Sequence, residues 1–105
     1  MPGLLVAAVY ETPHGRMLLL ADEDLVGRSF YDQDEGLILM IPEKLYSGRL
    51  VSESEAREEM RKADIIVATG RTAVSIAVRE GFAHPDSVIE IRGVPHVQVY
   101  KIPLG

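Results

Sequence analysis

Short hydrophobic runs, separated by turn-forming residues, predict a series of β-strands along the chain. Runs of this length that are rich in aliphatic and β-branched residues and bounded by Gly, Pro or Asp are typical of strands. The first two runs are separated by Glu11–Gly15, where Pro and Gly favour a tight turn, so we expect a hairpin there. The expected strands are residues 4–10, 16–21, 28–31, 37–41, 64–69, 88–91 and 94–102.

Two further segments have the pattern of helices. Ser52 and Glu55 have the spacing of a capping box, which predicts that a helix begins there. Its apolar stripe consists of Ala56, Met60 and Ala63. The second helix, about residues 72–80, is apolar around most of its circumference, so we expect it to be largely buried. Gly81 follows at the position where a left-handed C-cap is favoured.

The order of these elements predicts an α+β fold. The strands before residue 42 are joined as hairpins, whereas residues 64–91 form a strand–helix–strand (βαβ) unit, whose crossover is expected to be right-handed. We therefore expect one small domain, residues 1–105, with a mixed β-sheet, N-terminal antiparallel hairpins and one βαβ unit. The two main helices are expected to pack on one face of the sheet. A length of 105 residues is common for one domain.

Composition narrows the class of protein. Hydrophobic residues make up 47% and charged residues 26%, which indicates a globular chain. Cysteine is absent, which excludes disulfides, thiolate metal sites and cysteine nucleophiles, and favours a cytoplasmic location. The early apolar run Leu4–Val9 is too short to span a membrane and has no preceding basic residue, so we expect neither a membrane segment nor a signal peptide.

Net charge is −5, which argues against a large non-specific nucleic-acid surface. The acidity is uneven, however. Residues 1–35 contain two basic and seven acidic residues, whereas residues 71–105 contain four basic and three acidic ones. A local basic patch in the last third therefore stays open as a prediction.

The first candidate site is Thr69-Gly70-Arg71-Thr72, where a strand ends and a helix begins. Free amides at a helix start, the positive end of the helix dipole and a guanidinium together favour an anion. Loops at the carboxyl ends of strands are also where open α/β sheets bind ligands. The alternative is structural: Thr72 or Thr69 caps the helix, Gly70 permits the turn, and Arg71 is solvated.

The second candidate site is Arg92, His96 and Gln98. Gly93 and a stiff Val-Pro step fix the backbone, and alternation along a strand would place His96 and Gln98 on one face. An imidazole and an amide there could bind a base edge, or His96 could act as a general acid or base. The alternative is a structural histidine, since spacing places no carboxylate beside it.

No metal or cofactor site is predicted. The three histidines are scattered without ligand spacing, and neither a phosphate-binding loop nor a dinucleotide-binding glycine motif is present. The acidic segments Asp22–Asp24 and Asp32–Glu35 lack the loop length of a calcium site and are interpreted as solvated turns.

Several segments resemble domain-of-unknown-function family 424, a family of small archaeal proteins. They occur in the order Leu25–Phe30, Leu45–Gly48, Gly70–Val74, Gly81-Phe82 and Ile89–Gln98. The resemblance covers essentially the whole chain, and Gly-Val-Pro-His-x-Gln is its most specific part. It implies an archaeal source and a stand-alone α+β domain, and it brings no activity, substrate or catalytic residue.

Three functions stay open on the sequence. The favoured one is a non-catalytic module that binds RNA or a nucleotide phosphate through Thr69–Thr72 and Arg92–His96, with Gln98 beside them. The second is a small-molecule enzyme that uses His96 as acid or base. The third is a structural subunit whose N-terminal hairpin pairs with another chain, for example as a homodimer.

Overall fold

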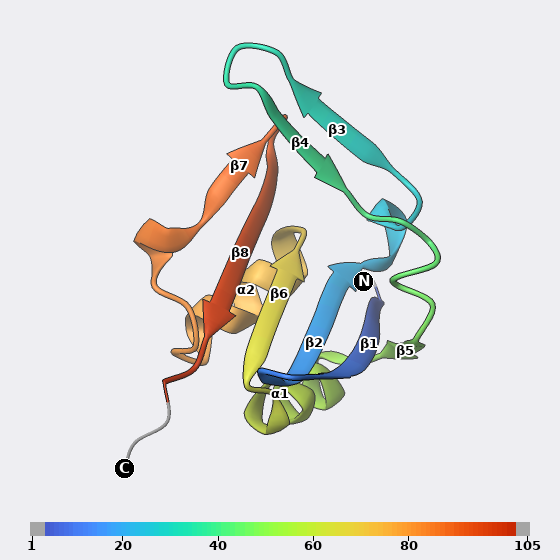
Figure 1. Cartoon of the computed structure of the whole chain (residues 1–105), viewed down its shortest axis with the longest axis vertical. Coiled ribbons are helices and arrows are strands. Elements are labelled where there is room, and N and C mark those ends of the chain that lie inside the picture. The colour runs from blue at the N-terminus through green and yellow to red at the C-terminus, as the bar shows by residue number, and fades with distance from the viewer. Residues whose placement is uncertain (1–3, 103–105) are drawn as a thin grey trace.

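The chain forms a six-stranded mixed sheet and a separate two-stranded hairpin (Figure 1). A computed structural model describes residues 4–102. The strand order of the large sheet is β5-β1-β2-β6-β8-β7, in which β2 and β6 are parallel and the other neighbours antiparallel. The strands are β1 (Leu5–Thr12), β2 (Gly15–Asp22), β3 (Ser29–Asp32), β4 (Leu37–Met40), β5 (Arg49–Val51), β6 (Ile65–Thr69), β7 (Ile89–Ile91) and β8 (Val94–Tyr100). The helices are α1 (Glu53–Lys62) and α2 (Arg71–Arg79), with 3-10 turns η1 (Glu23–Leu25) and η2 (Pro85–Ser87).

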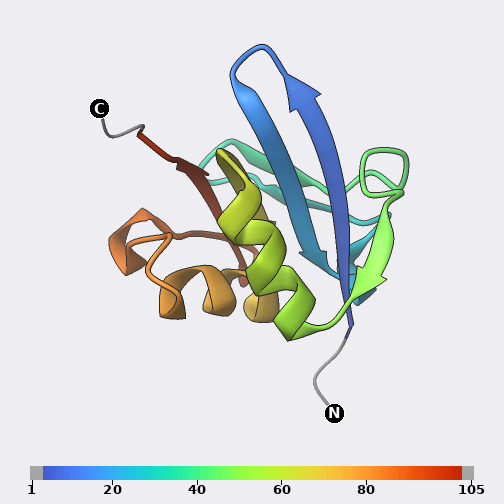
Figure 2. The ribbon, with the colours of Figure 1, turned by 90° about the horizontal axis from the view of Figure 1, so that it is seen from below.

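Both faces of the large sheet are covered. The helices α1 and α2 lie on one face, and the β3–β4 hairpin lies on the other (Figure 2). Alternation along β2 explains its continuous apolar run, because Leu18 and Leu20 face the helices while Leu19 and Ala21 face the hairpin. We call these the helix face and the hairpin face.

The predicted α+β fold is confirmed, including the N-terminal hairpins and two helices on one face. One part of it differs from the simplest expectation. The strands of the unit β6-α2-β7 run parallel, but β8 lies between them and pairs antiparallel with both. The sequence also did not predict β5, a three-residue edge strand on β1.

Both predicted helix caps are confirmed. The Ser52 hydroxyl accepts a hydrogen bond from the Glu55 amide at 3.2 Å, and the Ser52 amide donates to the Glu55 carboxylate at 3.0 Å. At the end of α2, Gly81 has φ 81° and the amide of Phe82 donates to the carbonyl of Ala77 at 3.0 Å. Neither α-helix in residues 4–102 has the length and hydrophobicity needed to cross a bilayer.

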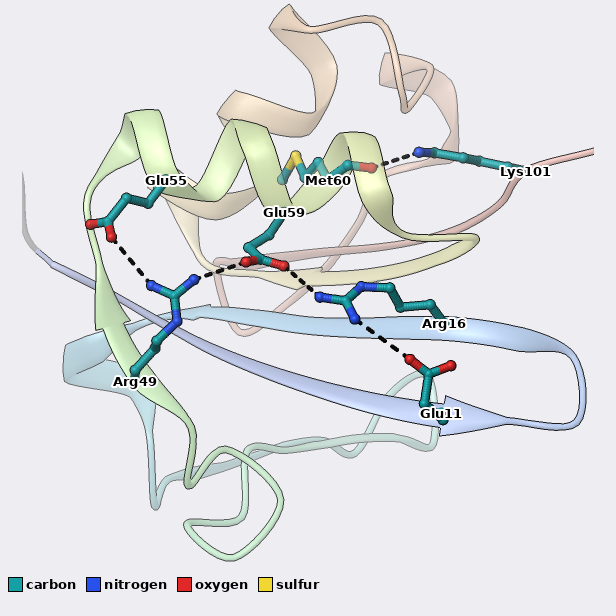
Figure 3. Close-up of polar contacts among 7 residues, drawn as sticks. All are labelled: Glu11, Arg16, Arg49, Glu55, Glu59, Met60 and Lys101. Carbon is teal, nitrogen blue, oxygen red and sulfur yellow. Dashed lines mark hydrogen bonds and ion pairs between the residues drawn. The ribbon is translucent and has the colours of Figure 1, made fainter.

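A chain of alternating charges joins α1 to the edge of the sheet (Figure 3). The side chain of Glu59 is only 9% exposed and contacts Arg16 at 3.0 Å and Arg49 at 2.8 Å. Arg49 also pairs with Glu55, and Arg16 with Glu11. Burial alone would raise the pKa of Glu59, but the neighbouring cations outweigh burial and the pKa is lowered. The buried carboxylate is therefore ionised, and it ties α1 to β2 and β5.

Lys101 stabilises the other end of α1. Its ammonium donates to the carbonyls of Met60 and Arg61 at 2.6 and 3.2 Å, which are among the last carbonyls of the helix. It also lies 4.5 Å from the ring centre of Phe82, so the residue after β8 contacts both α1 and the segment that follows α2.

Candidate functional site

The candidate site lies where two parallel strands send the chain to opposite faces of the sheet. After β2 the chain passes through η1 to the β3–β4 hairpin on the hairpin face. After β6 it turns at Gly70 into α2 on the helix face. Such a divergence leaves a crevice at the carboxyl ends of the strands, where ligands bind in open α/β sheets. We call it the switch-point crevice and define it by Asp22, Asp24, Gly70, Arg71 and Pro95.

Asp22, the last residue of β2, caps α2 from another element of the fold. Its two carboxylate oxygens accept hydrogen bonds from the amides of Thr72 at 3.1 Å and Ala73 at 2.9 Å. These are the amides that the sequence predicted to be open to an anion, so that part of the prediction is wrong. The helix start already holds an anion, the carboxylate of Asp22.

Gly70 is required by this cap. Its φ is 107°, a region that favours glycine, and a Cβ built on it would overlap with the Asp22 carboxylate. Its amide donates to the carbonyl of Pro95 at 2.9 Å, which holds the start of β8 against the crevice. Gly70 therefore serves the approach of Asp22 and contributes its backbone to the crevice wall.

Arg71 is the polar group of the helix start that remains available. It is exposed, and among residues 4–102 no ion pair includes its guanidinium. It lines two pockets that share Asp22 and Asp24, one of ≈ 140 Å³ and one of ≈ 430 Å³. Arg71 therefore stands between two hollows and can reach a ligand in either.

The two pockets differ in the residues that line them. The smaller one includes the apolar residues Leu25, Val94 and Pro95. The larger one adds Glu23 and Thr72 to its lining, together with Leu4. Across the two pockets, the linings contain three acidic residues, those at 22–24, and one guanidinium, so a bare anion is poorly matched to the charge of the crevice.

Arg92 lies next to the crevice without lining it. It occupies the two-residue turn between β7 and β8 with φ 55°, and Gly93 beside it has φ 80°. Positive φ at both positions is the requirement of a type I′ hairpin turn. Gly93 lines the smaller pocket, whereas the side chain of Arg92 is exposed beyond it.

The remaining predicted residues form a separate polar chain on the hairpin face. Thr69 is fully buried, and its hydroxyl lies 2.8 Å from Nδ1 of His96. Nε2 of His96 lies 3.3 Å from the amide nitrogen of Gln98, whose oxygen accepts from Tyr100 at 3.4 Å. Burial raises the pKa of the Tyr46 phenol, and the nearby Thr69 hydroxyl partly offsets that rise.

Within residues 4–102, no acidic side chain bonds to His96. Its ring nitrogens lie beside a hydroxyl and an amide, and burial lowers its pKa, so the imidazole is neutral at pH 7. None of the three pockets described is lined by His96 or Gln98. The arrangement holds a neutral histidine in the sheet, between a hydroxyl and an amide.

The structure therefore divides the predicted composite site in two. Gly70, Arg71 and Thr72 line the switch-point crevice, whereas Thr69, His96 and Gln98 belong to the polar chain. No described pocket is lined by both Arg71 and His96, because the side chain of Thr69 points to the hairpin face and the next residues start α2 on the other.

Sequence reasoning missed the acidic wall of the crevice. Asp22 and Asp24 were interpreted as solvated turn residues, yet both line the pockets. Their position directly after a strand was the available signal. Within residues 4–102, no group of three or more His, Asp or Glu side chains is arranged to hold a metal ion.

Comparison with known proteins supports the fold and leaves the ligand open. The sequence profile described as "Protein of unknown function (DUF424)" matches residues 10–102. The chain is similar to a solved structure described as an uncharacterized conserved protein from Methanopyrus kandleri. That similarity has a TM-score of 0.82 and 32% identity, over 98% of this chain and 96% of the other. A search of curated proteins finds no match.

Proposed function

Because the chain belongs to the DUF424 family of proteins of unknown function, we propose its function from its own crevice: it is a non-catalytic module that binds a nucleotide through Arg71. The observation that carries this proposal is that Arg71 and Asp24 line the same pocket at the carboxyl ends of β2 and β6. A reducing cytoplasm is the location that fits this proposal, since the chain has no cysteine.

A nucleotide matches the mixed chemistry of the crevice better than phosphate alone. The guanidinium of Arg71 can donate two parallel hydrogen bonds to a phosphate. Carboxylates accept hydrogen bonds from ribose hydroxyls, which is a role for Asp24. The apolar wall of Leu25, Val94 and Pro95 offers a surface for a flat base. The ligand thus places its negative charge on Arg71 and its hydroxyl groups toward the acids.

A long RNA strand is less favoured than a mononucleotide. Strand binding needs several cations along a groove, and the net charge is −5. Asp22, Glu23 and Asp24 would repel successive phosphates.

We do not propose catalysis by His96, because its ring nitrogens contact a hydroxyl and an amide.

Calorimetric titration of the full chain with ATP, dATP and inorganic phosphate tests the proposal. We expect ATP to bind, and Arg71→Ala to weaken binding by about tenfold or more, because hydrogen bonds to charged groups contribute about 1.5–3 kcal/mol. Asp24→Asn should reduce the preference for ATP over dATP. Inorganic phosphate should bind much more weakly than ATP.

Arg61→Ala is the matched control, since it removes the same charge from an exposed i,i+3 pair on α1. Its affinity for ATP should equal that of the wild type. The proposal is wrong if no ribonucleotide binds at millimolar concentration, or if Arg71→Ala and Arg61→Ala bind ATP equally well.

A further inference from the structure

The outer face of the β3–β4 hairpin is apolar and exposed. Phe30 and Leu39 point inward and pack against the large sheet. The alternate residues Tyr31, Ile38 and Met40 point outward, and they are 53%, 62% and 59% exposed. Tyr31 and Ile38 lie directly opposite each other across the hairpin, and Met40 follows Ile38 on the same face. These three side chains therefore form one continuous surface, which we call the outer patch.

The pattern of residues along β4 is that of a strand buried on both faces. The strand consists of four consecutive apolar residues, Leu37–Met40, and continuous apolar runs are typical of strands that are covered on two sides. In β2 the structure explains such a run, because the helices cover one face and the hairpin covers the other. Strand β4 packs against the large sheet with one face only. Its outer face therefore lacks the cover that its sequence predicts.

We propose that a second copy of the chain covers the outer patch, so that two β3–β4 hairpins pack face to face about a two-fold axis. Figure 1 shows the hairpin at one end of the longest axis of the molecule, away from α1. A symmetric dimer uses the same surface twice, so each outer patch would cover the other. Sheets that pack face to face keep their strands within about 30° of alignment, and the two-fold axis then lies in the interface, either along the strands or across them.

The two ends of the hairpin carry different charges. The turn between the strands, residues 32–36, contains three acidic residues and no basic one. At the other end, the exposed residue Arg28 directly precedes β3, while Glu43 and Lys44 after β4 balance each other. Within residues 4–102 no ion pair includes Arg28 or the acids of this turn. Both ends therefore keep charge that a partner can neutralise.

This charge difference selects the direction of the two-fold axis. An axis along the strands would bring the two acidic turns together, which is unfavourable. An axis across the strands brings each acidic turn to the Arg28 end of the other hairpin, so opposite charges meet at both ends of the interface. In that arrangement β3 lies over β3 of the partner subunit and β4 over β4 of the partner subunit, with the apolar side chains between them.

The interface is small, so the dimer is expected to be weak. The outer patch has the size of the largest apolar patch on a typical monomer, roughly 300–600 Å². Two such patches together bury less than the roughly 1,600 Å² of a standard interface, so we expect a dissociation constant of about 10–1,000 µM. The dimer does not rest on the nucleotide proposal, because no residue of the outer patch lines the switch-point crevice.

Sedimentation of the full chain from about 10 µM to 1 mM tests the proposal. The wild type should shift from monomer to dimer over that range. Ile38→Glu places a charge in the outer patch and should raise the dissociation constant about tenfold or more, because the residue occurs twice in the interface. Leu50→Glu is the matched control, since Leu50 is 51% exposed on β5, outside the patch, and it should dimerise like the wild type.

Charge reversal tests the orientation. Arg28→Glu should raise the dissociation constant about threefold or more, and so should a turn variant that combines Asp34→Lys with Glu35→Lys. The chain that carries all three changes again has opposite charges at the two ends and should dimerise better than either.

Circular dichroism checks that each variant is folded. A wild type that stays a monomer at every concentration overturns the proposal. A folded Ile38→Glu that dimerises as well as Leu50→Glu also overturns it, because the outer patch is then not the interface. If the three combined changes dimerise no better than Arg28→Glu, the proposed orientation is wrong and the proposal fails with it.

Discussion

Replacement of Glu59 by glutamine is expected to loosen α1 from the sheet. Glu59→Gln keeps the size of the side chain and removes its charge, so the two arginines that bracket it lose their shared partner. Arg16 contacts one oxygen at 3.0 Å and Arg49 the other at 2.8 Å. The Nε of Arg16 is itself buried without a hydrogen-bond partner, so this guanidinium depends on its carboxylate contacts.

The magnitude follows from burial. Removing one member of a fully buried ion pair costs about 3–5 kcal/mol. Here the Glu59 side chain is 9% exposed, but those of Arg16 and Arg49 are 33% and 55% exposed, so water compensates part of the loss. We expect Glu59→Gln to lower the free energy of unfolding by about 2 kcal/mol, or Tm by about 10 °C.

Urea unfolding at pH 7, followed by circular dichroism, measures this difference without screening charges. Glu58→Gln is the matched control on the same helix. Glu58 and Arg61 form a solvent-exposed pair, with side chains 56% and 57% exposed. Glu58→Gln should therefore lower the free energy of unfolding by less than about 0.5 kcal/mol. If the two variants lose equal free energy, the argument from burial is refuted.

The pH dependence gives an independent check. Burial raises and the cations lower the pKa of Glu59, and the net result lies below its ordinary 4.5. A carboxylate with a lowered folded-state pKa stabilises fully above the unfolded value and loses that stabilisation as pH falls through the folded value. The difference in free energy of unfolding between wild type and Glu59→Gln should therefore be constant above pH 4.5 and become smaller below it. A difference that does not change with pH would show that the charge of Glu59 is not its cause.

Three further predictions concern the crevice and the polar chain. Asp22→Asn should lower the free energy of unfolding by about 1 kcal/mol in urea, because a neutral amide caps α2 less well than a carboxylate; unchanged stability would contradict the capping role. Gly70→Ala should lower the free energy of unfolding by about 2 kcal/mol or more, and by more than Gly81→Ala does, because both positions have positive φ but only at Gly70 would a Cβ overlap with a neighbour. If both variants lose the same free energy, backbone strain alone explains the loss and the overlap with Asp22 does not contribute. Burial lowers the pKa of His96 from 6.5, so the unfolded chain binds the extra proton first and stability should fall as pH drops below 6.5. Thermal unfolding at pH 7 and pH 5 should show a smaller loss for His96→Gln than for the wild type, and identical losses would argue against a buried neutral imidazole.

Local patterns in the sequence predicted the elements well. The capping box at Ser52 and the glycine cap at Gly81 each depend on residues a few positions apart, and both have the predicted geometry. The continuous apolar runs predicted strands, and their side chains alternate between two core clusters on opposite faces of the sheet. The family resemblance and the α+β class are also confirmed. Both depend on local features, namely short motifs and the order in which the elements follow one another along the chain.

The sequence by itself therefore determined most of the segments that become strands and helices, although not β5, and that Arg71 begins a helix at the end of a strand. Only the tertiary structure decided which strands are neighbours, since β8 inserts between β6 and β7 and β2 pairs with β6 across a long stretch of chain. It also decided that Asp22, fifty residues before Thr72, fills the helix start. The physical reason is range: periodicity and capping report on neighbours along the chain, whereas strand order and long-range caps depend on how the whole chain closes around its core.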